Sequence, residues 1–80
     1  MPRFFFHNHT DGVLIEDLEG TELPALDMAR AEAIVDLRHF AADALRQGFP
    51  IKNCHIDIYD TARQLLATVS ARDAIQPLLP

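Results

Sequence analysis

The chain has 80 residues, is 49% hydrophobic and 24% charged, and carries a formal net charge of −5. This length suffices for one core, so we predict a single domain over residues 1–80, with 76–80 as a tail that docks or frays. The negative charge and the scattered cations argue against nucleic acid as the main partner. No apolar run reaches the ~18 residues needed to cross a membrane. A lone cysteine fits a reducing compartment, and we predict a cytoplasmic protein.

The N-terminal segment predicts a β-hairpin. Arg3 to His9 is rich in aromatic residues, as strands are, and Val13 to Asp17 is expected to return beside it. Asp11-Gly12 between two apolar runs is a strong hairpin signal. A two-residue loop pairs Thr10 with Val13, His9 with Leu14, Asn8 with Ile15 and His7 with Glu16. Because side chains alternate across a sheet, one face then carries Phe4, Phe6, Val13 and Ile15.

A long helix is predicted from Leu26 to Gln47, after a polar connection over Leu18 to Leu23. Gly48 and Pro50 are typical of the residues that follow a helix end. At about 100° per residue, one arc of the helix collects apolar side chains that need a partner surface. That arc contains Leu26, Ala29, Ala33, Ile34, Leu37, Phe40, Ala41, Ala44 and Leu45.

The C-terminal third predicts a second hairpin. Cys54 to Asp60 alternates between apolar and polar residues, and Gln64 to Ser70 returns after a turn at Thr61 to Arg63. The alternation places Cys54 in the core with Ile56 and Ile58, and it places Leu65, Ala67 and Val69 on one face of the returning strand. Ala71 to Gln76 is expected to add a helical turn.

The element order ββαββ predicts an α+β fold: one four-stranded antiparallel sheet with the long helix packed on one face. With strands numbered along the chain, the spatial order is 2-1-3-4 or 1-2-4-3. We favour 2-1-3-4, because Phe4 to Phe6 suits a central strand and Ile15 to Asp17 suits a charged edge.

Four strings occur in the same order as in a known family: PRFFFH at Pro2–His7, EGTELP at Glu19–Pro24, ARAEA at Ala29–Ala33 and LLATVSARDA at Leu65–Ala74. In these the chain resembles a domain-of-unknown-function family of short bacterial proteins, common in alphaproteobacteria. The resemblance runs from about Pro2 to Ile75 and implies no activity, substrate or catalytic residue. Asn8, Ala25 and Arg63 depart from the family's usual apolar, acidic and glycine residues.

Two or three imidazoles and a carboxylate are predicted to share the polar face of the sheet. In the order 2-1-3-4, the third strand brings His55 and Asp57 to the face that carries His7 and His9, and Glu16 lies opposite His7. Such a set suits zinc or another divalent metal, so the candidate ligands are His7, His9, His55 and Glu16. The alternative is an ordinary polar face that is solvated or self-associates.

The same face is expected to expose apolar side chains among the polar ones, as interaction surfaces do. The candidate interface residues are Phe5, Leu14, Tyr59 and Leu66. Arg30 falls within the apolar arc of the helix, where a charge needs a partner. We expect Arg30 to act as a structural clamp on the acidic residues Asp17, Glu19 and Glu22, with a rim arginine that reaches water as the alternative.

No motif specifies a reaction, so we predict neither a catalytic residue nor a bound organic cofactor. The leading hypothesis is a non-enzymatic interaction or regulatory module that forms a homodimer, because a chain this short has little core of its own. The alternatives are a metal- or small-ligand-binding protein that uses the open sheet face, and an antitoxin-like partner protein suggested by fold analogy.

Overall fold

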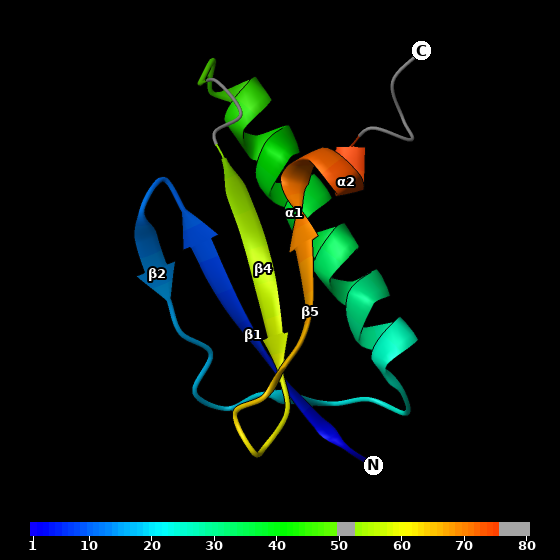
Figure 1. Cartoon of the computed structure of the whole chain (residues 1–80). Helices are drawn as coiled ribbons and strands as arrows, with labels where there is room; N and C mark the ends of the chain where they lie inside the picture. The colour runs from blue at the N-terminus through cyan, green and yellow to red at the C-terminus, as the bar shows by residue number, and fades with distance from the viewer. Residues whose placement is uncertain (50–52, 76–80) are drawn as a thin grey trace.

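One long helix crosses one face of an antiparallel sheet (Figure 1). The computed structural model describes residues 1–49 and 53–75. Its elements are β1 (Arg3–Thr10), β2 (Val13–Ile15), β3 (Thr21–Glu22), α1 (Leu26–Arg46), β4 (Cys54–Tyr59), β5 (Leu65–Ser70) and α2 (Ala71–Ile75). The α+β class is confirmed. The predicted tail at 76–80 and the predicted helix stop at Pro50 lie outside the described residues.

The first hairpin has the predicted register, with Thr10 opposite Val13, His9 opposite Leu14 and Asn8 opposite Ile15. Asp11 and Gly12 have positive φ angles of 52° and 81°. Two central residues of this kind form the turn whose twist matches that of the flanking strands. β2 ends at Ile15, two residues earlier than predicted, so Glu16 is not part of the strand.

The sheet has five strands, which corrects the predicted four. Its path is β2-β1-β4-β5, and β3 also pairs with β1, with Arg3 opposite Glu22 and Phe4 opposite Thr21. β2 and β3 pair with different ends of β1, the first with residues 8–10 and the second with residues 3–4. The segment predicted as a polar connection is thus partly a strand. This strand could not be predicted from an apolar pattern, because both residues of β3 are polar and exposed.

The core lies between α1 and the face of the sheet beneath it, which is formed by β4, β5 and Phe4 of β1. In β4 the burial alternates as predicted, with Cys54, Ile56 and Ile58 buried. α1 contributes Ala29, Ala33, Leu37 and Ala41 to the core. The short side chains of the three alanines allow a close approach of helix and sheet, and Leu37 fills the remaining depth. α2 is the predicted helical turn, and it closes this layer with Ala71 and Ala74.

The helix covers less of the sheet than its apolar arc predicts. α1 packs mainly on β4, β5 and α2, and its C-terminal turns reach past the start of β4 (Figure 1). Phe40 and Leu45, expected in the core, are exposed. Val13 and Ile15 lie on the helix side of the sheet but are exposed as well, because α1 does not extend over β2.

One further expectation fails at β5. An irregularity between Ile58 and Tyr59 shifts the β4–β5 register, so that Leu65 pairs with Tyr59 and is exposed, whereas Ala67 and Val69 are buried as predicted. In the described part of the chain, neither helix combines the length and apolarity needed to cross a membrane.

Candidate functional site

The polar side chains of β1 and β4 meet on the face of the sheet turned away from α1, here called the open face. The register sets His9 opposite His55 and His7 opposite Asp57. Because alternate residues of β4 are buried under α1, their neighbours His55, Asp57 and Tyr59 point to the open face. Both strands are paired over six positions, so these side chains stand on a rigid, hydrogen-bonded platform.

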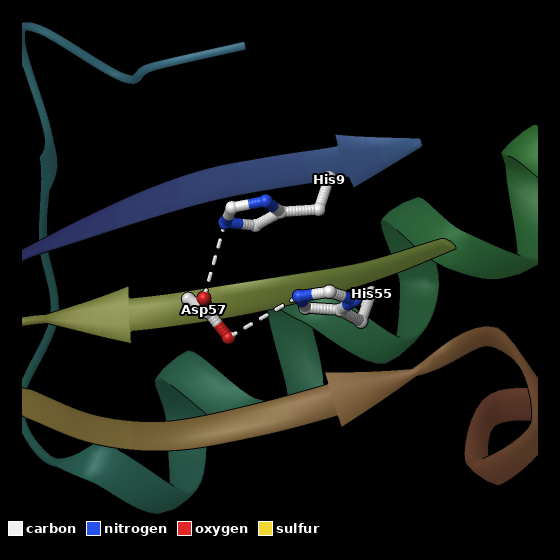
Figure 2. Close-up of side chains that lie close together, drawn as sticks. All are labelled: His9, His55 and Asp57. Carbon is white, nitrogen blue, oxygen red and sulfur yellow. Dashed lines mark ion pairs between the residues drawn. The ribbon is translucent and has the colours of Figure 1, made fainter. Parts of the chain in front are cut away.

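His9, His55 and Asp57 form a compact cluster at the centre of the open face. Nε2 of His9 lies 3.1 Å from Oδ2 of Asp57, and Nε2 of His55 lies 3.7 Å from Oδ1. The two imidazole rings are stacked, with centroids 4.5 Å apart and planes inclined by 12°. Figure 2 shows each ring turned toward a different oxygen of the same carboxylate.

The Asp57 carboxylate is held in place by the neighbouring strand. The hydroxyl of Thr68, directly opposite it in β5, donates a hydrogen bond of 2.8 Å to Oδ1. The Asp57 side chain is 14% exposed, against 35% for His9 and 41% for His55. The carboxylate therefore forms the floor of the cluster, and the two imidazoles form its accessible rim.

His7 and Glu16, two of the four predicted ligands, lie outside this cluster. Nδ1 of His7 accepts a hydrogen bond of 3.1 Å from the backbone N–H of Asp17, and its ring lies 4.9 Å from that of Tyr59. Glu16 follows the end of β2 and is exposed. The structure thus brings together His9 and His55 of the predicted set, and it supplies Asp57 as the carboxylate in place of Glu16.

Asp17 organises the chain between β2 and β3. Its Oδ1 accepts backbone N–H groups from Glu19 at 3.3 Å and Gly20 at 3.0 Å. Its Oδ2 accepts the N–H of Phe6 at 3.1 Å. Phe6 lies in the gap between the residues of β1 that pair with β2 and those that pair with β3, so the carboxylate satisfies a backbone donor that neither strand serves.

These donors affect the acidity of Asp17. Burial acts to raise the pKa of the carboxyl, but the three N–H donors stabilise its charged form, and the net result is a pKa below the ordinary value of 3.8. Because the pKa of Asp17 is lower in the folded state, its carboxylate stabilises the fold at pH values above its ordinary pKa. This contribution is lost as the pH falls through the folded-state pKa.

We predict that Asp17→Asn lowers the free energy of unfolding at neutral pH by about 1–2 kcal/mol, because an amide nitrogen cannot accept an N–H. The wild type becomes less stable between about pH 5 and pH 2 as Asp17 is protonated, and the variant lacks this part of the decline. Urea unfolding at pH values from about 7 down to about 2 measures both effects. Asp36→Asn, the same change at an exposed position of α1, is the control. Parallel pH profiles for wild type and Asp17→Asn would contradict the prediction.

Arg30 is exposed, as the alternative of a rim arginine expects, and Arg3 contacts the acidic segment. Nη1 of Arg3 donates to the carbonyl oxygens of Glu19 at 2.8 Å and Gly20 at 3.5 Å. Its Nη2 lies 3.1 Å from Oε1 of Glu22. The pairing of β3 with β1 places Arg3 opposite Glu22. The two residues are far apart in the sequence, so their contact could not be predicted from sequence distance, which favoured Arg30.

An open hollow of about 570 Å³ adjoins the cluster on the open face. It is bounded by β1, the segment from β2 to Leu18, and the turn after β4. Its lining residues are Phe5, His7, His9, Leu14, Glu16, Asp17, Leu18, Tyr59, Asp60, Thr61 and Arg63. Three of the four predicted interface residues line this hollow; Leu66 does not.

Cys54 is buried, as predicted, and burial raises the pKa of its thiol. A thiol of this kind is inert at neutral pH. The alternation of its strand already predicts Asp57 on the open face, although it was not among the candidate ligands. The sequence signal for Asp17 is weaker. It is the spacing Asp-x-x-Gly, in which the aspartate side chain often accepts backbone N–H groups of a turn. Arg3 carries no such signal.

Residues 3–72, which include every residue of the cluster, match the family described as "Domain of unknown function (DUF6894)". No curated protein and no solved structure matches the chain.

Proposed function

Because the chain belongs to DUF6894, a family without an assigned activity, we propose from its geometry that it is a non-enzymatic interaction module that forms a homodimer through β2. One observation carries the proposal: all three residues of this edge strand are apolar and exposed, Val13 by 60%, Leu14 by 47% and Ile15 by 61%. An edge strand also presents unpaired backbone N–H and C=O groups, to which another strand can add.

Within residues 1–49 and 53–75, no other segment covers these side chains. α1 lies over β4 and β5, and β2 is the outermost strand on its side of the sheet. Its three residues include neither a charge nor a proline, which are the usual protection of an exposed edge. A short chain with a small core also gains more from association than a large one.

A second copy fits this strand by symmetry. If two β2 strands pair antiparallel about a two-fold axis at Leu14, the Leu14 side chains face each other on the open face. On the helix side, Val13 of each copy faces Ile15 of the other. This contact is self-complementary, as a two-fold interface requires, and it joins the two sheets into one. The interface then includes Leu14 of the predicted set, while Phe5 and Tyr59 stay in the hollow.

Sedimentation velocity on the full chain at micromolar concentrations tests the proposal. We expect a dimer for the wild type and at least a tenfold weaker association for Ile15→Lys, since lysine on an edge strand opposes pairing. The matched control is Val35→Lys on the outer side of α1, where Val35 is 47% exposed. A monomeric wild type at high micromolar concentration, or equal effects of the two variants, would contradict the proposal. The predicted cytoplasmic location stays a prediction.

A further inference from the structure

The open face carries an arrangement of ligand atoms that the proposed dimer does not use. We propose that His9, His55 and Asp57 bind a divalent transition metal ion, and that zinc is the ion they fit best. Each residue offers one ligand atom, and these atoms all lie within 4.8 Å of one another. They come from the two central strands of the sheet and belong to the part of the chain that matches the family.

The distances between the ligand atoms suit a single ion. Zinc binds imidazole nitrogen and carboxylate oxygen at about 2.0–2.2 Å, so neighbouring ligands of a tetrahedral ion are about 3.4 Å apart. Nε2 of His9 lies 3.1 Å from Oδ2 of Asp57, close to this value, and the three ligand atoms all lie within 4.8 Å of one another. An ion can therefore bind with small rotations of side chains and without movement of the backbone.

The chemistry of the set selects the class of metal. Two imidazole nitrogens favour zinc and its neighbours in the transition series, whereas calcium and magnesium prefer oxygen ligands throughout. Two histidines and one acidic residue are a known three-residue set for zinc sites that keep one position open. Here the accessible rim formed by His9 and His55 leaves that position toward solvent, where water or a ligand atom completes the coordination.

Thr68 prepares the carboxylate for this role. Its hydroxyl donates to Oδ1 of Asp57, which fixes the carboxylate plane and leaves Oδ2 to the ion. Partners of this kind orient the ligands of metal sites, and their removal lowers affinity by roughly 10- to 100-fold. His7, by contrast, is occupied by the N–H of Asp17, so it is not a ligand despite lying on the same face.

The alternative is that both imidazoles only form ion pairs with Asp57. The two arrangements differ in what they bind, so calorimetric titration of the full chain, free of any histidine tag, with zinc chloride separates them. We expect one zinc ion per chain. His55→Ala and Asp57→Asn should each weaken binding at least tenfold, and Asp57→Asn keeps the shape and the oxygen that accepts from Thr68.

Two histidine variants control for general effects of losing an imidazole. His39→Ala removes an exposed imidazole from α1, and His7→Ala removes the neighbouring one on the open face. Both should bind zinc as the wild type does, and circular dichroism checks that every variant is folded. Cobalt in place of zinc should give the visible absorption of a four- or five-coordinate ion, lost in His55→Ala. Absence of zinc binding by the wild type, or equal binding by the wild type and His55→Ala, would overturn the proposal.

Discussion

Leu37→Ala should lower the free energy of unfolding by about 2–5 kcal/mol, the range for removing a fully buried leucine. Leu37 is 0% exposed and lies in the row of α1 residues that faces the sheet between small alanines. Neighbouring alanines have no side-chain atoms that could fill the space left behind, so a cavity remains. For a chain of this size, the loss corresponds to a fall in melting temperature of roughly 10 °C or more.

Val35→Ala is the matched control for this variant. It also shortens an apolar side chain of α1, but at an exposed position on the outer side. Surface changes of this kind alter stability by no more than about 0.5 kcal/mol. Thermal unfolding followed by circular dichroism measures both variants. Similar melting temperatures for the two would show that the Leu37 row of α1 is not what packs on the sheet.

Gly20→Ala should destabilise the protein by about 2–4 kcal/mol in total. The φ angle of Gly20 is +72°, and an alanine in this conformation costs roughly 1–2 kcal/mol. A Cβ there would also lie 2.9 Å from the carbonyl oxygen of Phe4, a backbone atom that cannot turn aside. Relief of this contact requires the chain to move away from β1, at a further cost of about 1–2 kcal/mol. That movement would also break the hydrogen bond that the backbone N–H of Gly20 donates to Asp17.

Gly48→Ala isolates the contribution of the contact. Gly48 has a similar φ of +78°, but nothing lies within 4 Å of the Cβ position. We therefore expect only the backbone part of the cost at this position. Chemical unfolding of both variants gives the difference directly. Equal losses of stability would show that Gly20 is needed for its φ angle alone and not for the close approach of β3 to β1.

Local signals predicted most of the fold. Asp11 and Gly12 determine a two-residue turn, and that turn sets the register of three residue pairs in the first hairpin. The helix from Leu26 ends within one residue of its predicted end, because Gly48 follows it at a positive φ. These features depend on interactions among residues close in sequence.

The candidate cluster was predicted in part. Alternation along two strands is enough to place His9, His55 and Asp57 on one face once the strands are neighbours. The identity of the carboxylate was missed, because the return of the chain after Ile15 was expected to continue as a strand with Glu16 opposite His7. In the structure the chain instead turns at Asp17, whose backbone N–H binds His7.

By itself, the sequence determined which segments are helix and strand apart from β3, the turn of the first hairpin, and which side of each strand carries imidazoles. Periodicity and turn chemistry act over a few residues and can be read without knowing the neighbours. Only the tertiary structure decided that Arg3 and not Arg30 contacts the acidic segment, that Asp57 joins the two histidines, and that β2 is left without cover by α1. These outcomes depend on where the helix crosses the sheet and on which backbone groups of β1 stay unpaired. Packing between segments far apart in the chain determines these two features.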